Sequence, residues 1–480
     1  MSSSSASQSA ARAADASHLE LIESSTPGGA APSAATADPG LGHELLTGWA
    51  KHPAIEGTTR HGEDLERITR DAVLSRGLGR AYADAALPPV GCSRPVAVTP
   101  LADRVLTFDS QTGRMRAEAG LSLRSLRNIF LSRGWFTPVS PGTGHVTLGG
   151  MVAADIHGKN HHSAGCIGRH VHAVKLRTGD GELREVSRES NRPLFEATLG
   201  GMGLTGHILE VELDLERLPS PWIYEESVRF PNLEAMMAGL AEAADAWPMT
   251  VAWMDTSARG KNAGRGILMR GRWAEPHEAP AHPPKIKSSV RMPFDFPSGL
   301  ANPFTFRILN TLWYHKHGSK ARSHVVHPES FYWLLDMIDE WNRVFGKRGF
   351  TQYQCVLPSE ASLFREVLDI FQRMGGCSFV TVFKDCGEVG EGMLSFPQRG
   401  TSLALDIPMR RNGETEALCQ ALNEFVVANG GRIYLAKDAF TSKEHFDRMY
   451  PRLEEFRELK RRYDPDGRLE SAQARRLGLV

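Results

Sequence analysis

The sequence predicts an α+β fold of more than one domain, and three observations favour this class. The chain has 480 residues, enough for two or three hydrophobic cores. Strand-like and helix-like patterns follow one another from residue 353 to 436, as in a sheet with helices on one face. A glycine- and histidine-rich stretch at 140–171, typical of neither helix nor strand, follows an earlier set of short strand patterns.

Composition and charge exclude several classes of protein. Lys and Arg together number 56, and Asp and Glu together also number 56. Nothing in the net charge therefore points to nucleic acid or to strong attraction by anionic membranes. No window approaches the ~18 to 20 apolar residues of a membrane span. The 6 cysteines form no C-x-x-C pairs, which predicts free thiols in a reducing compartment. We therefore expect a cytoplasmic protein, either free or peripheral at the inner membrane face, or one in a pathway that faces the periplasm.

The N-terminal region predicts a tail followed by a phosphate-binding turn. Residues 1–42 are rich in Ser, Ala, Gly and Pro, which predicts disorder, and no apolar segment follows a basic start as in a signal peptide. A short strand at 72–74 leads into RGLGRAYAD at 76–84, whose glycines let the backbone turn and expose N–H groups. A strand at 95–98 and a hairpin across 112–113 follow.

A helix is expected from an N-cap at Ser122 to Gly134, and then the central stretch begins. We interpret this stretch as backbone that wraps a large polar cofactor, with His157 and Lys159 at or near it. The alternative is a glycine-rich loop with incidental histidines. A hairpin follows at 174–186.

A G-x-G-x-x-G motif occurs at 200–206. In a nicotinamide-binding unit this motif opens a helix, but here residues 209–215 alternate apolar and polar side chains as a strand does. We therefore reject a Rossmann site and place these glycines in a turn or beside a ligand.

The composition changes at 219–221, which we take as a domain boundary. The segment 275–303 is rich in Pro, Ser and basic residues and is expected to be a long loop, either a lid or a contact surface. A charged helix at 443–462 is expected to stop at a turn, 463–467. Helices are predicted at 232–245, 329–344, 360–374 and 415–429, and strands at 249–254, 353–357, 378–384, 402–408 and 432–436.

Four segments in this order resemble one family: 76–84, PGTGHVTLGGMVAADIHGKNHHSAG at 141–165, 200–206, and RIYLAKD at 432–438. They are similar to the vanillyl-alcohol-oxidase-like FAD flavoproteins, in particular to flavin subunits of polyprenylphosphoryl-ribose epimerases. The resemblance runs from about residue 45 to the end. It implies a two-domain PCMH-type FAD-binding fold in which 43–221 and 432–480 form the FAD domain. Residues 222–431 would form a substrate domain with an antiparallel sheet and helices.

The resemblance also assigns the cofactor contacts. The family's pyrophosphate-binding turns match 76–82 and 142–150, and 154–157 would run beside the flavin. The first turn lacks the histidine that carries covalent flavin in some relatives, so we expect non-covalent FAD, with His157 as the remaining candidate for a link. The residues implied to bind FAD are Arg76, Gly77, Leu78, Gly79, Arg80, Ala81, Tyr82, Gly142, Thr143, Thr147, Leu148, Gly149, Gly150, Ala154, Asp155, Ile156, His157, Gly158, Asn160, His161, Gly206 and Tyr434.

The reaction implied by the resemblance is oxidation of a sugar secondary alcohol by hydride transfer to flavin N5. Lys437 matches the family's catalytic lysine, and a lysine with a lowered pKa can accept a proton. As an ammonium it could instead anchor the substrate; the plain alternative is a surface lysine at a strand end. Tyr82 and His157 complete the expected catalytic set.

A substrate pocket is likewise implied. Gln352 and Gln354 share one strand face because side chains alternate along a strand. Trp253 and Tyr314 could instead be ordinary core aromatics. The residues matched to the pocket are Trp253, Tyr314, Gln352, Gln354, Val382, Lys384, Ser402 and Lys437.

The sequence departs from the family in the first glycine turn and within this pocket. Ala81 and Ala83 replace Ser and Gly, Ser402 and Ala404 replace Asn and Cys, and Cys386 replaces an aromatic residue. We expect these changes to affect specificity and not FAD binding.

The implied substrate is a polyprenylphosphoryl-β-D-ribose, oxidised at its 2′-hydroxyl as the first half of epimerisation to the arabinose form. A short-chain reductase partner would reduce the keto product. A peripheral membrane contact is expected through 275–303, which carries Lys285, Lys287 and Arg291. The alternative is oxidation of a free sugar, an alditol or an aldonolactone.

A metal site is the other possibility that the histidines raise. His157 and His161 stand at i and i+4, but Gly158 lies between them and no carboxylate or cysteine spacing completes a ligand set. We expect no bound metal.

Overall fold

The computed structural model describes residues 40–285 and 289–479. The predicted tail therefore lies, up to residue 39, outside the described residues. The first strand begins at Leu41, slightly earlier than expected.

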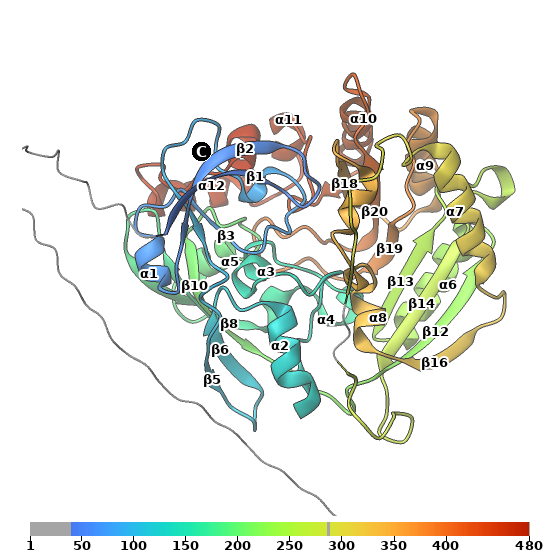
Figure 1. Cartoon of the computed structure of the whole chain (residues 1–480), viewed down its shortest axis with the longest axis horizontal. Helices are drawn as coiled ribbons and strands as arrows, with labels where there is room; N and C mark the ends of the chain where they lie inside the picture. Colours follow the sequence, from blue (N-terminus) through green and yellow to red (C-terminus); the bar gives the residue numbers. More distant parts are fainter. Residues whose placement is uncertain (1–39, 286–288, 480) are drawn as a thin grey trace, which may run out of the picture. The chain divides into compact units, whose positions relative to one another are not determined.

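Two small sheets come from the N-terminal half of the chain (Figure 1). In the first, β1 and β2 are antiparallel, whereas β2 and β3 both run parallel to β4. Its order is β1-β2-β4-β3, with β1 Leu41–Thr47, β2 Ala54–His61, β3 Leu74–Arg76 and β4 Val96–Val98. The second sheet is antiparallel, of order β5-β6-β10-β8-β9, with β5 Val105–Phe108, β6 Arg114–Glu118, β8 Val171–Arg177, β9 Leu183–Ser187 and β10 His207–Asp214.

Helix α2, Leu123–Phe130, packs against the second sheet and begins as the sequence predicts. The Ser122 hydroxyl accepts a hydrogen bond from the Ser125 N–H, which satisfies one of the unpaired donors at a helix start. The chain leaves the helical conformation at Gly134, which has φ of 78°. The short helix α5, Arg192–Thr198, was not predicted.

The central stretch contains helices, contrary to the sequence expectation. Helix α3, Leu148–Ala153, begins at Thr147, whose hydroxyl accepts from the Gly150 N–H. Helix α4, His161–Ala164, follows after two turns that flank an isolated bridge between His157 and Cys166. The N-cap threonine and the burial of Leu148 and Met151 against the second sheet outweigh the low helix propensity of the glycines.

An antiparallel eight-stranded sheet forms the other half of the described structure. Its strand order is β16-β12-β14-β13-β19-β20-β18-β21. The strands are β12 Ile223–Phe230, β13 Met249–Met254, β14 Gly266–Trp273, β16 Arg322–Val326, β18 Phe350–Leu357, β19 Thr381–Cys386, β20 Gly400–Pro408 and β21 Arg432–Ile433. The sequence did not predict β12, β14 or β16, and β21 is shorter than predicted.

Three helices cover one face of this sheet: α6 Leu233–Ala246, α9 Ala361–Arg373 and α10 Glu414–Ala428. The odd-numbered residues of β18, such as Tyr353 and Cys355, join Phe364 of α9 and Leu418 of α10 in one apolar core. The even-numbered residues of β18 point to the opposite face, although every residue of this strand is buried. The sheet therefore has a second buried face, on which β18 places polar side chains.

Residues 329–344 do not form the predicted helix. The segment contains the short helix α8, Pro328–Tyr332, two 3₁₀ turns and a two-residue strand β17, Ile338–Asp339. Leu334 and Ile338, which the helix would have buried, are exposed. The reason is tertiary: the segment is held by contacts with the central stretch, where Trp333 Nε1 donates to Ser140 Oγ at 2.9 Å.

The predicted loop 275–303 is irregular apart from β15, Val290–Arg291, which pairs in parallel with β17. Residues 286–288, including Lys287, lie outside the described residues. Helix α7, Pro303–Lys316, follows this loop and was not predicted from the sequence.

The C-terminal segment returns to the N-terminal strands (Figure 1). The predicted helix 443–462 is broken into α11, Lys443–Asp447, and α12, Leu453–Tyr463, since Pro451 between them cannot continue a helix. Beyond α12, the N–H groups of Glu470 and Ala472 donate to carbonyls of Val73 and Leu87. Helix α13, Ala472–Leu477, then packs on the 3₁₀ turn Asp84–Ala86.

Arg476 of α13 links the C-terminal segment to the N-terminal part of the chain. Its guanidinium lies 2.8 Å from Asp84 Oδ1 and 2.9 Å from Asp438 Oδ2, and it donates to the Thr441 carbonyl. Both carboxylates are buried. The division into a discontinuous FAD domain and a substrate domain stays a prediction.

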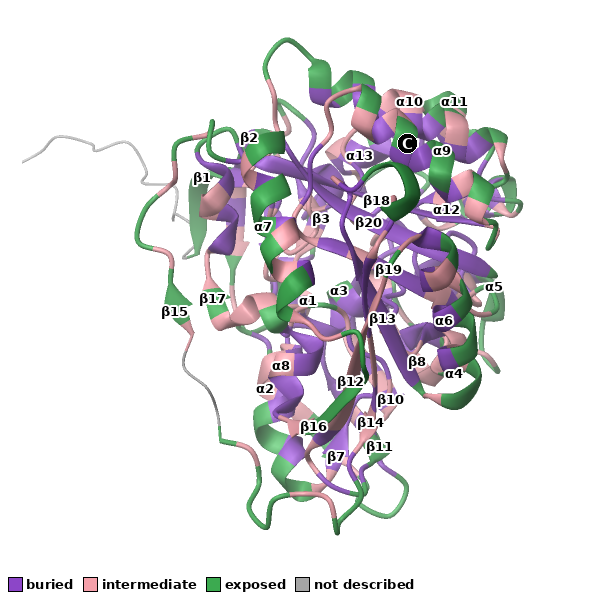
Figure 2. Cartoon of the chain, turned by 90° about the vertical axis from the view of Figure 1, so that its right-hand side faces the viewer, coloured by how far each residue is buried: buried purple, intermediate pink, exposed green. Residues whose placement is uncertain are grey.

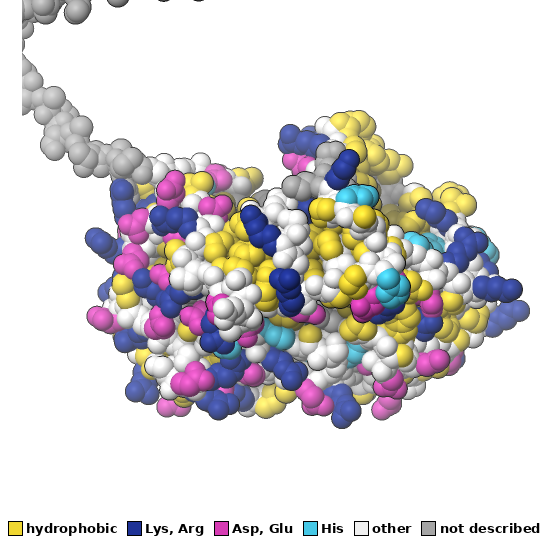
Figure 3. Space-filling model, turned by 90° about the horizontal axis from the view of Figure 1, so that it is seen from below, with side chains coloured by type: hydrophobic (Ala, Val, Ile, Leu, Met, Phe, Trp, Pro, Cys, Tyr) yellow, Lys and Arg dark blue, Asp and Glu magenta, His cyan; other side chains and the backbone are white. Residues whose placement is uncertain are grey.

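No helix among the described residues is long and apolar enough to cross a membrane. Seen from below, the surface carries hydrophobic side chains in its middle among scattered charges of both signs (Figure 3). This mixture agrees with the balanced composition of the chain.

Candidate active site

Polar side chains line the sheet face that α6, α9 and α10 leave free. Strand register sets them in rows: Gln352 of β18 faces Asp406 of β20, and Ser402 of β20 faces Lys384 of β19. Gln354 stands opposite Ala404, which in turn faces Val382. Because direct cross-strand partners share a face, the predicted pocket residues of β18, β19 and β20 come together.

Gln352 links this face to the first glycine turn. Its amide Nε2 lies 3.2 Å from the Tyr82 hydroxyl oxygen and also donates to Asp406. Burial raises the pKa of Asp406, whose Oδ2 has no hydrogen-bond partner among the described residues. Gln352 Oε1 is also buried and unpaired in the described part of the chain. Such atoms carry a free-energy cost unless a ligand or water satisfies them.

His157 faces the same row through Gln354. Gln354 Nε2 lies 3.0 Å from His157 Nε2 and 3.0 Å from Ser402 Oγ. With the amide donating, His157 carries its proton on Nδ1, which has no partner among the described residues. Burial, with help from nearby Lys384, holds the pKa of His157 well below its usual value, so the ring is neutral. The site thus contains an unpaired ring N–H.

Two lysines in this region have lowered pKa values because they are buried. Lys384 donates to the Gly158 carbonyl at 3.0 Å, and its pKa falls to about 8. Lys159 donates to the Phe331 carbonyl, and its pKa also falls to about 8. Lys159 is therefore tied to the 328–345 segment, while Lys384 belongs to the polar sheet face.

Tyr434 and Lys437 come from the turn after β21. The Tyr434 hydroxyl donates to the Ala154 carbonyl at 3.2 Å, and its ring centroid lies 5.0 Å from that of His157. Lys437 Nζ lies 5.4 Å from the ring centroid of Tyr82. Burial lowers the pKa of Lys437, the nearby Asp406 carboxylate opposes this, and Lys384 adds to it. All three expected catalytic residues therefore meet at one place.

The two glycine turns lie against each other beside this site. A Cβ on Gly77 would come within 2.4 Å of Thr147 Oγ1, so only glycine allows the two turns this approach. Gly79 has φ of +64°, and a Cβ on Gly142 would meet nothing within 4 Å. Residues 75–82 are all partly exposed. Open backbone in two adjoining turns suits a large polar ligand.

Several predicted cofactor residues have structural contacts instead of free side chains. Arg76 donates to the carbonyls of Thr47 and Ala86, and the Arg80 guanidinium stacks 4.0 Å from the Trp49 ring centroid. Asp155, at φ of 37°, accepts from Gly168 N–H and Ser395 hydroxyl. Their side chains shape the turns, so any contact with FAD would come from the backbone.

The remaining predicted positions are placed as follows. Leu148, Gly149 and Ile156 are buried, Gly150 is exposed, and Leu78, Ala81, Thr143 and Ala154 are partly exposed. The Asn160 amide donates to the Pro138 carbonyl, and the His161 ring accepts from the Gly387 N–H and contacts Cys166. Gly206 packs on the Arg177 carbonyl.

Trp253 and Tyr314 lie apart from the glutamine row. They form a small apolar cluster with Ile267, in which Trp253 Nε1 donates to the Phe379 carbonyl. The Tyr314 hydroxyl donates to the Phe230 carbonyl at 3.2 Å. Their contacts are those of core aromatics, the alternative raised from the sequence, and their role in a pocket stays a prediction.

Sequence reasoning missed two acids at this site. Asp406 has the same strand parity as Ser402 and Ala404, a signal that alternation alone could have revealed. Asp336 accepts from Gly144 N–H at 2.7 Å and from the Thr143 hydroxyl at 3.0 Å. Nothing in the sequence pattern points to that contact, which joins segments far apart in the chain.

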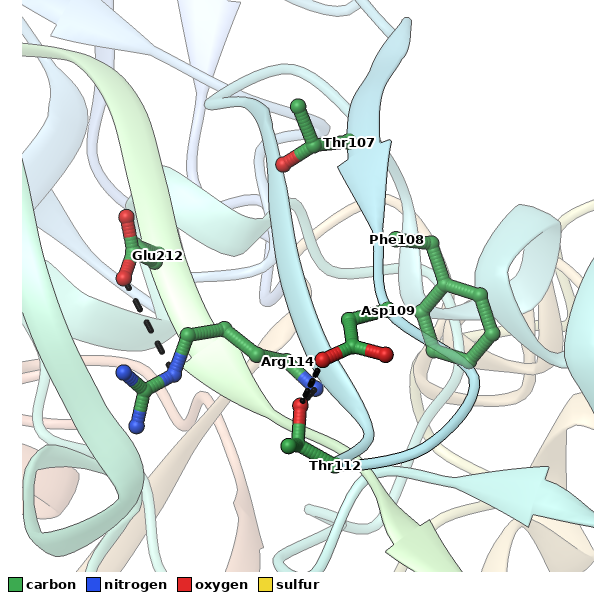
Figure 4. Close-up of a pocket in the computed structure, with 6 residues that line it drawn as sticks. All are labelled: Thr107, Phe108, Asp109, Thr112, Arg114 and Glu212. Carbon is green, nitrogen blue, oxygen red and sulfur yellow. Dashed lines mark hydrogen bonds and ion pairs between the residues drawn. The ribbon is translucent and has the colours of Figure 1, made fainter.

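The described residues also bear on a metal site and on a surface pocket. Among residues 40–285 and 289–479, no group of three or more His, Cys, Asp or Glu is placed to hold a metal ion. A surface hollow of about 450 Å³ lies at the β5–β6 hairpin (Figure 4). Its lining residues, which include Thr107, Arg114 and Glu212, contain none of the predicted site residues.

Comparison with known proteins identifies the family. The chain is 37% identical over 454 residues to decaprenylphosphoryl-β-D-ribose oxidase of Mycolicibacterium smegmatis, covering 91% of this chain and 97% of that protein. The chain belongs to the decaprenylphosphoryl-β-D-ribose oxidase family. Residues 68–187 match the FAD binding domain family, and residues 386–477 match the D-arabinono-1,4-lactone oxidase family.

Two further relatives extend the comparison. An uncharacterized protein of Streptomyces coelicolor is 35% identical over 370 residues, which is 75% of this chain and all of that protein. Bovine L-gulonolactone oxidase is 29% identical over 132 residues, 27% of this chain and 28% of that enzyme. As a member of the decaprenylphosphoryl-β-D-ribose oxidase family, the protein is an FAD-dependent oxidoreductase acting on CH–OH groups. The predicted PCMH-type α+β class is confirmed.

The residues at the site fit FAD. The adjoining glycine turns offer open backbone, and the buried unpaired atoms of Gln352, Gln354 and His157 require hydrogen-bond partners. Which residues contact FAD stays a prediction.

Denaturing the protein with acid is expected to release FAD into the supernatant, because no histidine or cysteine lies in the first glycine turn. The measurement is flavin absorbance in supernatant and pellet. His157→Ala serves as the control: flavin that stays with precipitated wild-type chain but not with this variant would show a covalent link at His157.

Proposed function

We propose that the protein oxidises a ring hydroxyl of a lipid-linked pentose, namely the 2′-hydroxyl of a polyprenylphosphoryl-β-D-ribose, as the first half of epimerisation to the arabinose form. The product would be a 2′-keto sugar, which a reductase of the short-chain type would reduce. The similarity to the M. smegmatis oxidase over nearly the whole chain supports this substrate.

The observation that carries the proposal is the buried polar sheet face opposite Tyr82 and His157. Gln352 and Gln354 each keep an amide oxygen buried and unpaired within the described residues, and these oxygens can accept hydrogen bonds from sugar hydroxyls. Lys384, whose pKa is about 8, supplies positive charge next to them, which suits a phosphate diester. A pocket of this kind orients a sugar by hydrogen bonds and its phosphate by charge.

The chain's own residues move the proton. FAD, when bound, supplies the hydride acceptor for the carbinol carbon. The neutral amine of Lys437 accepts the hydroxyl proton, and its lowered pKa makes this amine available below the range of an ordinary lysine. The Tyr82 hydroxyl, held by Gln352, hydrogen-bonds the same carbinol oxygen.

Flavin bleaching tests the proposal. Purified protein is mixed without oxygen with a polyprenylphosphoryl-ribose in detergent, and absorbance near 450 nm is followed. Bleaching by the lipid-linked sugar and not by free ribose, alditols or aldonolactones is the expected result. The second candidate, an aldonolactone oxidase, is favoured by the match at 386–477 and by the gulonolactone oxidase relative, and bleaching by an aldonolactone alone would support it instead.

The substitution Asp406→Asn is expected to shift the pH profile of kcat/KM to lower pH. An ionised Asp406 raises the pKa of Lys437, so its removal lowers that pKa. If the free amine is the active form, kcat/KM rises with pH through the pKa of Lys437, and this rise moves toward acid in the variant. A rise that stays in place, or moves toward alkali, would contradict the coupling.

A further inference from the structure

Helix α7 has one face that the described structure leaves uncovered. Its inner residues are fixed: Phe306 is buried, Asn310 donates to Asp255 and to the Ser378 carbonyl, and Tyr314 packs on Trp253. The helix is therefore firmly placed, and much of its outer side carries the exposed colour in Figure 2.

The outer face is apolar. Phe304, Ile308 and Leu312 stand four residues apart and form one stripe. Phe304 is 74% and Leu312 65% exposed, and Ile308 and Leu309 beside them are 45% and 40% exposed. Such contiguous exposed apolar residues on a helix mark an interaction surface.

The chain segment that carries this stripe is basic. No Asp or Glu occurs between residues 296 and 328, although the chain as a whole is 23% charged and neutral. Within that interval the exposed positions include Arg307, Lys316, Lys320 and Arg322. Exposed apolar residues in a segment that carries basic and no acidic residues are the pattern of a helix lying in the interface of an anionic membrane.

The inner side of α7 leads toward the candidate active site. Phe306 belongs to an apolar cluster that contains Phe345 and Phe350 and against which Tyr82 packs. The ring centroids of Tyr82 and Phe350 are 5.7 Å apart. Apolar side chains thus extend from the helix to the tyrosine that Gln352 holds.

We propose that the outer face of α7 docks on an anionic lipid bilayer. The proposal rests on the proposed function, because a polyprenyl carrier keeps the substrate in a bilayer and the enzyme must work at its surface. It replaces the 275–303 loop as the main contact, since Arg291 of that loop is paired with Glu340.

Vesicle co-sedimentation of the holoenzyme tests the surface. Vesicles of phosphatidylcholine with roughly one-third phosphatidylglycerol are compared with phosphatidylcholine alone. Wild type is expected to bind the anionic vesicles and to release at high salt. The variant Phe304→Ser/Ile308→Ser/Leu312→Ser should lose binding about tenfold or more, because three apolar side chains no longer enter the interface.

The matched control replaces equally exposed apolar residues elsewhere, Leu45→Ser/Val90→Ser/Leu106→Ser, where Val90 is 79% and Leu45 64% exposed. It should bind as wild type does. Equal binding of both triple variants would overturn the proposal. So would a wild-type dimer, seen by light scattering without lipid, that the α7 variant converts to monomer with no vesicle binding by either protein.

Two readouts separate this proposal from the proposed function. Flavin bleaching by lipid-linked ribose in detergent reports the chemistry without a bilayer, and the α7 variant should keep it. Bleaching in detergent without vesicle binding refutes only the docking surface. Vesicle binding without bleaching by any lipid-linked sugar refutes only the substrate assignment.

Discussion

Replacing Lys437 by alanine is expected to leave FAD bound and to lower kcat by about 10²- to 10⁴-fold, the usual contribution of a positioned proton acceptor. Lys437 Nζ lies over the Tyr82 ring, and burial lowers its pKa toward the range of a general base. Stopped-flow measurement of flavin reduction gives the rate of the chemical step, and absorbance near 450 nm gives the FAD content.

Lys437→Arg separates the two roles open to this side chain. Arginine keeps the positive charge but cannot release a proton at working pH. Loss of kcat with little change of KM in this variant supports proton acceptance, whereas retained kcat would assign Lys437 to substrate anchoring. Lys443→Ala is the control, because Lys443 is half exposed and pairs with Asp447 of helix α11, away from the site.

Replacing Arg476 by methionine is expected to lower the free energy of unfolding by about 3–5 kcal/mol, the usual cost of removing one partner from a buried ion pair. Asp84 and Asp438 would remain buried without their common cation. Since Arg476 joins the C-terminal helix to the turn after the first glycine motif, we also expect weaker retention of FAD. Urea unfolding followed by fluorescence, with FAD release measured in parallel, checks both.

Arg475→Met provides the neighbouring control. Arg475 pairs with Glu470 and has a side chain that is 54% exposed, so its loss should lower the free energy of unfolding far less than the loss of Arg476. If Arg476→Met does not fold, Arg476→Met with Asp84→Asn and Asp438→Asn removes the unpaired charges and should recover part of the stability. Equal unfolding midpoints for Arg475→Met and Arg476→Met would contradict the proposed role of the network.

Local patterns predicted some regular elements closely and missed others. Strand 249–254 has the predicted bounds. The helix expected at 329–344 failed because Asp336 and Trp333 make contacts with residues 140–144 that no local pattern encodes. Helix α7 has the sequence signals of a helix start, with Asn302 as N-cap and Pro303 in the first turn. These residues stand at the end of a proline-rich segment, and the whole segment was therefore predicted to be a loop.

In the candidate site, too, local features could be predicted and contacts between distant segments could not. Alternation along a strand put Gln352 and Gln354 on one face from the sequence alone. It could not reveal that β19 lies next to β20, nor that Gln352 reaches Tyr82, 270 residues away in the chain. The resemblance to a known family supplied Lys437, because contacts between such distant segments depend on the whole fold.

In strand β18 the odd-numbered residues face the apolar core and the even-numbered residues face the polar side of the sheet. This alternation limits how the sequence can vary there. Substitutions at even positions such as Gln352 can alter specificity while the helix-facing core keeps its packing. Inserting or deleting one residue at the start of the strand would exchange the two sets, turning Tyr353 and Cys355 toward the polar face and the glutamines into the core. We therefore expect relatives of this protein to differ within β18 by substitution and never by a change of length.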